Sequence, residues 1–156
     1  MRNKFYSDIA TKTAIAVARQ AANQKQIVTG EFIRQVWREA GSGHGESMLK
    51  GPTLFVFQSL AESGCIQGIP PGKYLIKINN NSKVGTENRD RAMALYAKIK
   101  TLNQWPAGSK PEQGYDDPVI WNDISTELGI NLVPDPRGCV AVIKGLFEAG
   151  LLKLAP

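Results

Sequence analysis

The sequence has little of what marks an enzyme, a metalloprotein or a membrane protein. Its 156 residues include one histidine and two cysteines, and a usual zinc site would need both cysteines besides that histidine. No apolar run approaches the roughly 18 residues of a membrane-spanning helix. The basic start is not followed by the apolar segment of a signal peptide. We therefore expect a cytoplasmic, non-enzymatic protein with no metal, cofactor or membrane contact.

The two cysteines, Cys65 and Cys139, each lie in an apolar stretch. They are enough for one disulfide, but buried free thiols are typical of cytoplasmic proteins. We expect both thiols to be free and buried.

Acidic residues are scarce in the first half of the chain. Residues 1–84 hold 11 Lys and Arg against 5 Asp and Glu, whereas residues 85–156 hold 8 against 9, so the first half carries the whole surplus of the net charge of +5. Such asymmetry is typical of a protein with one face for an acidic partner, and the alternative is a surplus that serves solubility alone.

Apolar residues at helical spacing predict three helices in each half. Ser7 or Asp8 is the expected N-cap of the first helix, and Thr29 and Gly41 are expected to cap and stop the second. Residues 73–78 and the polar turn after them predict a short β-hairpin near 73–84. The expected helices cover about 7–24, 30–40, 52–63, 87–103, 118–128 and 137–149.

The second half repeats the order of the first. Residues 60–66 match 146–152 at an offset of 86, the first helices match at an offset of 78, and the middle helices match at 88. The predicted fold is mainly α, with two tandem three-helix units, 1–84 and 85–156, packed as one body. The alternative is a chance likeness of helix-glycine patterns. At the offset of 88, Val36, Glu39 and Gly41 fall on Ile124, Glu127 and Gly129.

The order of three helices, then glycine, then an apolar pair resembles the trihelical core of helix-turn-helix and winged-helix proteins. A second likeness rests on Lys50-Gly51-Pro52, the segment 88–95 and Gly64-Cys65-Ile66-Gln67-Gly68-Ile69-Pro70-Pro71-Gly72-Lys73-Tyr74. In these residues the chain resembles a family of small, uncharacterised bacterial proteins, which implies a helical fold and no activity. It departs from that family by inserting roughly ten residues after Tyr74.

Base-specific DNA reading needs polar side chains on the outer face of the third helix. The helix at 52–63 is expected to leave only Gln58, Ser59 and Glu62 outside, which weighs against such reading. Cations elsewhere in the first half suit phosphates or another acidic surface. The alternative for the two arginines among them is a solvated face paired with Glu31, Gln35 and Glu39. The candidate binding residues are Arg34, Arg38, Lys50, Lys73, Lys77 and Lys83.

Three other features have simpler explanations than a site. The loop 41–47, with the only histidine, His44, is interpreted as a linker rather than an anion-binding nest. Asp116, Asp117 and Asp123 are interpreted as the acidic start of a helix rather than a magnesium site. The tryptophans are expected on inner faces or at a helix end, so no base-stacking platform is indicated.

These observations predict a non-enzymatic binding protein whose basic first unit contacts an acidic partner. Nucleic acid, bound weakly and without regard to sequence, is the first expectation, and an acidic protein surface is the second. The alternative is a protein-protein adaptor, of the accessory type found in phages and defence systems, in which the basic bias has no role.

Overall fold

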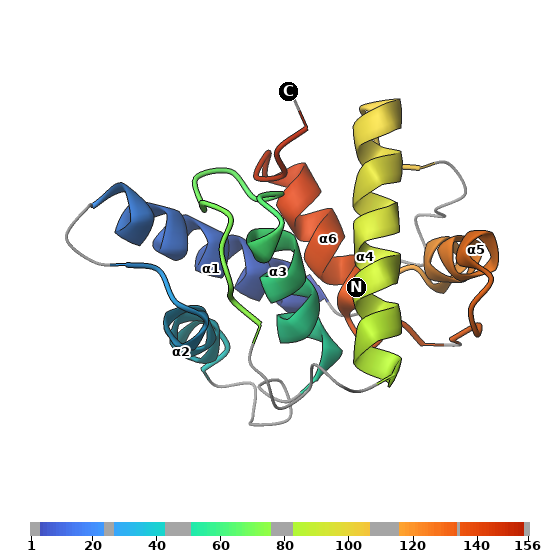
Figure 1. Cartoon of the computed structure of the whole chain (residues 1–156), viewed down its shortest axis with the longest axis horizontal. Helices are drawn as coiled ribbons and strands as arrows, with labels where there is room; N and C mark the ends of the chain where they lie inside the picture. The colour runs from blue at the N-terminus through green and yellow to red at the C-terminus, as the bar shows by residue number, and fades with distance from the viewer. Residues whose placement is uncertain are drawn as a thin grey trace.

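The computed structural model describes residues 4–23, 27–42, 51–75, 83–106, 116–133 and 135–154. These residues contain no regular strand, and a single isolated antiparallel bridge joins Ile66 to Leu152. The prediction of a mainly helical fold is confirmed. The helices are α1 (Lys4–Ala22), α2 (Gly30–Ala40), α3 (Pro52–Glu62), α4 (Lys83–Leu102), α5 (Pro118–Leu128) and α6 (Cys139–Glu148) (Figure 1).

Local capping signals set the bounds of α2, as predicted. The Thr29 hydroxyl accepts a hydrogen bond from the Phe32 N–H at 3.0 Å, and the Gly41 N–H donates to the Trp37 carbonyl at 2.9 Å. The N-cap predicted at Ser7 or Asp8 is wrong, because α1 begins at Lys4 and Ser7 lies inside it. The buried Ser7 hydroxyl donates instead to the carbonyl of Ala141 at 2.6 Å.

Helices α3 and α6 form the centre of the molecule. They pack on each other; α4 covers α3, and α1 covers α6. Helix α2 packs on α1 and α3, helix α5 packs on α4 and α6, and the two lie on opposite sides of the molecule (Figure 1).

Every residue from Thr53 to Ala61 in α3 is buried. The prediction that Gln58 and Ser59 face outward is therefore wrong. Ser59 donates to the carbonyl of Phe55, and Gln58 donates to the carbonyl of Gly30. A helix with neighbours on all sides has its polar side chains satisfied internally, and the apolar pattern of α3 alone could not show this.

The predicted β-hairpin near 73–84 is also wrong where the structure describes it. Residues 73–75 form no strand, and α4 already begins at Lys83; residues 76–82 lie outside the described part. Helices hold the backbone of Tyr74, whose N–H donates to Glu62 Oε1 at 3.2 Å. Its carbonyl oxygen lies 2.4 Å from where a Cβ on Gly30 would stand, so α2 approaches this segment as closely as only glycine permits.

Both cysteines are free and buried, which confirms the prediction. None of the helices in the described ranges is long and apolar enough to cross a membrane.

Candidate binding site

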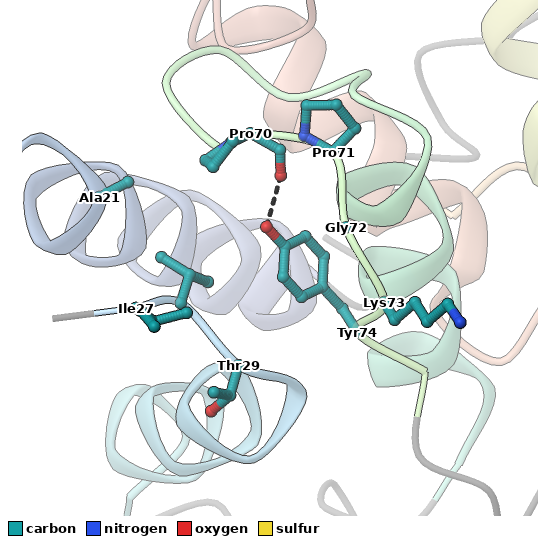
Figure 2. A pocket seen from close by; sticks show the side chains of 9 residues that line it. Ala21, Ile27, Thr29, Pro70, Pro71, Gly72, Lys73 and Tyr74 are labelled. Atoms are coloured by element: carbon teal, nitrogen blue, oxygen red, sulfur yellow. Dashed lines mark hydrogen bonds between the residues drawn. The ribbon is translucent and has the colours of Figure 1, made fainter.

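The segment that follows α3 folds back on itself and is held at Tyr74. After Gly64, which adopts a φ of 76°, the chain runs through Pro70 and Pro71 to Tyr74. The Tyr74 hydroxyl donates to the carbonyl of Pro70 (Figure 2). With its N–H on Glu62 and its ring buried, Tyr74 is fixed at both ends.

A groove of about 580 Å³ lies between this segment, the end of α1 and the chain that leads into α2. The Tyr74 ring projects toward its middle, with Ile27 on the facing side (Figure 2). Ile27 is 87% exposed, more than any other large apolar side chain in the described ranges. The lining residues are Ala21, Ile27, Val28, Thr29, Pro70, Pro71, Gly72, Lys73 and Tyr74.

Three of the six predicted site residues belong to the two segments that meet where Gly30 contacts Tyr74. Lys73 precedes Tyr74 and is exposed; its side chain leaves the segment on the side opposite the Tyr74 ring (Figure 2). Arg34 and Arg38 follow Gly30 at intervals of four residues, so Gly30 and both arginines lie on one stripe of α2. We call Lys73, Arg34 and Arg38 the basic patch.

The other predicted site residues cannot be placed beside the patch. Lys50 and Lys77 lie outside the described residues, and of Lys83 the structure describes only the backbone at the start of α4.

The basic patch is not neutralised within the described part of the chain. The ion pairs found there involve Arg91 and Lys98, not the patch. Glu39 accepts from the Gln35 amide at 3.4 Å rather than from an arginine, and Glu62 accepts from the Tyr74 N–H. The Nε of Arg34 is shielded from solvent and has no hydrogen-bond partner among the described residues. Within the described residues, no carboxylate therefore forms an ion pair with Lys73, Arg34 or Arg38.

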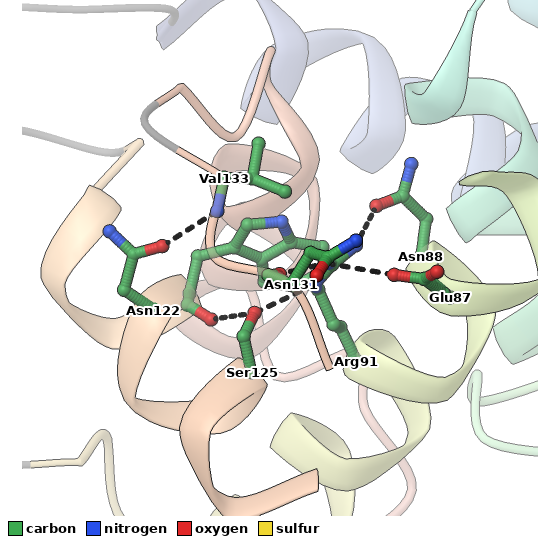
Figure 3. A network of polar contacts seen from close by, with 8 residues as sticks. Glu87, Asn88, Arg91, Asn122, Ser125, Asn131 and Val133 are labelled. Carbon is green, nitrogen blue, oxygen red and sulfur yellow. Dashed lines mark hydrogen bonds and ion pairs between the residues drawn. The ribbon is translucent and has the colours of Figure 1, made fainter. Parts of the chain in front are cut away.

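A buried polar network around Arg91 was missed by the sequence analysis. The Arg91 guanidinium donates to Ser125 Oγ at 2.7 Å, to Asn88 Oδ1 at 2.8 Å and to the carbonyl of Asn131 at 2.6 Å (Figure 3). Glu87 pairs with it at 3.4 Å. Burial lowers the pKa of Arg91, and the charge of Glu87 opposes that shift. The network joins α4 to α5 and the chain beyond it, which makes Arg91 a structural residue.

Of the three carboxylates interpreted as the acidic start of a helix, only Asp117 caps α5; Asp116 lies at the start of α6 instead, and Asp123 lies inside α5 beyond its first turn. Asp117 accepts from the Val119 N–H at 2.8 Å and begins α5. Asp116 accepts from the N–H groups of Gly138 and Ala141 and begins α6. In the described ranges, no three His, Cys, Asp or Glu residues come together as a metal site would require. Of the loop with His44, residues 43–47 lie outside the described part.

The tryptophans occupy the inner positions expected of them. Trp37 and Trp121 are buried. Trp105 is half-buried, lies 5.7 Å from the ring of Phe147 and has the Lys144 Nζ 5.6 Å from its centroid.

The resemblances noted in the sequence stay predictions. No family model, curated protein or solved structure matches this chain.

Proposed function

We propose that this chain is a non-enzymatic binding protein that holds an acidic partner on the basic patch. The observation that carries the proposal is the absence of ion pairs at Lys73, Arg34 and Arg38 within the described residues, although Glu39 and Glu62 lie nearby in the sequence. Exposed cations without intramolecular partners attract anionic surfaces and speed their encounter.

The framework behind the patch is, in this proposal, two copies of one three-helix unit. The ends of α3 and α6 support this at the offset of 86. Gly64 and Gly150 follow the two helices with φ of 76° and 71°. The next N–H groups, of Cys65 and Leu151, each donate to a carbonyl five residues back at 2.9 Å. Both ends therefore close with the same hydrogen-bonded turn.

The middle helices support the duplication at the offset of 88. Helices α2 and α5 both have 11 residues, and both are capped at the matching positions Thr29 and Asp117. The contacts between elements are also reciprocal, because α1 packs on α6 while its counterpart α4 packs on α3. The first helix of each copy would thus pack on the third helix of the other copy.

The basic patch is not part of this shared framework. At the offset of 88, Arg34 and Arg38 correspond to Asn122 and Thr126, which are uncharged. Asn122 accepts a hydrogen bond from the Val133 N–H at 3.0 Å and so has a local structural role. Since the second copy keeps its middle helix without arginines, the arginines of α2 are better explained by a partner than by stability.

An acidic protein is the partner that the geometry favours. The buried α3 has no outer face to place in a DNA groove, and a groove lined mostly by apolar groups borders the patch. Nucleic acid is the second candidate, supported only by cations that form no ion pair within the described residues, and it would be bound through phosphates without reading bases.

Affinity capture from a lysate of the source cells tests the proposal. The bait is the wild-type chain, a variant with Arg34→Glu and Arg38→Glu, or a control with Lys100→Glu and Lys153→Glu, which reverses two exposed charges elsewhere. Each capture is repeated after nuclease treatment, and the captured proteins are identified by mass spectrometry.

We expect the wild type and the control to enrich the same acidic protein, with or without nuclease, and the arginine variant to lose it. A capture abolished by nuclease would move the proposal to nucleic acid. A capture that the arginine variant retains in full would show that the basic patch is not the binding surface.

A further inference from the structure

We propose that the groove beside the basic patch binds an extended acidic peptide segment of the partner and seats one aliphatic side chain between Ile27 and the exposed rings of Pro70 and Pro71. The inference rests on the proposed function and adds the chemistry of the bound segment.

The groove is formed before any partner arrives. Tyr74 is held by its hydroxyl on Pro70 and its N–H on Glu62, and its carbonyl lies against Gly30. On the facing side, Thr29 is fixed as the N-cap of α2. A surface whose side chains are already ordered loses little conformational entropy on binding, which favours a specific ligand.

The groove offers an aliphatic contact that the fold itself does not use. Ile27 is 87% exposed, and the proline rings of Pro70 and Pro71 are exposed across from it. An aliphatic side chain placed among them would remove apolar surface from water on both partners. The volume of about 580 Å³ suits a short stretch of chain rather than a folded domain.

The backbone at the groove edge favours an extended ligand. Thr29 is extended, with φ of −126° and ψ of 162°. Within the described residues, the N–H and carbonyl groups of Ile27 and Val28 make no backbone hydrogen bond. Such an edge can pair with the main chain of an extended peptide, as in strand addition.

The charged residues at and beside the groove favour an acidic peptide. Among the described residues that line the groove there is no carboxylate, and Lys73 is the one charged residue. Arg34 stands one helical turn beyond Gly30, which borders the groove at Tyr74. A peptide that leaves the groove along α2 would carry its acidic residues past Arg34.

An array of short synthetic peptides, combining acidic residues with aliphatic or serine positions, tests this inference. Labelled wild-type chain is compared with Ile27→Ser and with the matched control Leu132→Ser, since Leu132 is an aliphatic residue 62% exposed away from the groove. The variant with Arg34→Glu and Arg38→Glu is read on the same array. Circular dichroism checks that each variant is folded, and labelled duplex DNA is titrated in parallel.

We expect the wild type and Leu132→Ser to bind acidic peptides that contain an aliphatic residue, and Ile27→Ser to bind these about ten-fold more weakly. Ile27→Ser should keep its residual preference for acidic peptides, which the arginine variant should lose. Equal binding by Ile27→Ser and the wild type would overturn the groove while leaving the basic patch in place. Binding of duplex DNA with no binding of any peptide would overturn it in favour of nucleic acid. An arginine variant that binds like the wild type would overturn the proposed function itself.

Discussion

Ile66 and Leu152 join the ends of α3 and α6 through an antiparallel bridge. The Gln67 N–H donates to the carbonyl of Leu151, and the Lys153 N–H donates to the carbonyl of Cys65, each at 2.7 Å. A shift of 86 positions relates Gln67 to Lys153 and Cys65 to Leu151, so each of the two hydrogen bonds corresponds to the other. The bridge therefore lies where a two-fold axis between two copies of the unit would pass.

Hydrogen exchange provides a test of the proposed symmetry. The amides of Gln67 and Lys153 should exchange slowly and at similar rates, because each makes the same bond across the bridge. The amide of Ile27, which makes no backbone hydrogen bond within the described residues, should exchange much faster. Nuclear magnetic resonance measures all three. If Lys153 exchanged as fast as Ile27 while Gln67 stayed protected, the two bonds would not be equivalent.

The crossing of α1 over α6 depends on Gly145. A Cβ at this position would stand 2.6 Å from Ser7 Cβ and 2.8 Å from the Ser7 carbonyl oxygen. Gly145→Ala should therefore lower the free energy of unfolding by about 1–3 kcal/mol, despite alanine's higher helix propensity. Gly41→Ala is the control, because its Cβ would meet Ile9 at an ordinary 3.4 Å. Urea unfolding compares the two, and equal stabilities would contradict the close crossing.

The buried cation Arg91 should matter more to stability than an exposed one. Arg91→Met keeps the apolar stem but leaves Ser125, Asn88 and the Asn131 carbonyl without their donor. We expect a loss of about 3 kcal/mol. Lys98→Met breaks a pair with Glu127 whose side chains are 36% and 56% exposed, and it should cost less than about 1 kcal/mol. Thermal unfolding that ranks the variants the other way would refute the structural role of the network.

Local signals in the sequence predicted the peripheral helices well. Helices α2 and α5 have the predicted bounds, because Thr29, Gly41 and Gly129 cap them within their own neighbourhoods. The predicted bounds of α4 were less accurate, since its first turn falls where the hairpin was expected.

Features that depend on distant partners could not be predicted. Gln58 was expected outside, but α3 has neighbours on every side. Arg91 stands one turn before the buried Leu95, but its partners Ser125 and Asn131 come from beyond α4, and the helical pattern did not indicate them. The groove depends on the contact of Tyr74 with Gly30, which are 44 positions apart in the sequence.

Alkaline pH should destabilise the fold. Burial raises the pKa of the Cys65 and Cys139 thiols above the ordinary 9.0, and that of the Tyr6, Tyr74 and Tyr96 hydroxyls above 10.0. The unfolded chain therefore releases these protons at lower pH than the folded chain does. The stabilisation of the fold that comes from these pKa shifts is complete below about pH 9 and is lost as the pH rises further. Urea unfolding from about pH 8 to pH 10 should show a falling free energy of unfolding. A constant or rising value would contradict these shifts.

The basic patch is tested most directly by the affinity of the captured partner for charge-reversed variants. Isothermal titration calorimetry at low salt gives the dissociation constant for the wild type, for Arg34→Glu with Arg38→Glu, and for Lys100→Glu with Lys153→Glu. Both variants change the net charge equally, so only the position of the change differs. We predict that the arginine variant raises the dissociation constant at least about ten-fold, that the lysine variant stays within about two-fold of the wild type, and that this gap narrows as salt is added. Equal losses in the two variants, or no loss in the arginine variant, would contradict the assignment of binding to Lys73, Arg34 and Arg38.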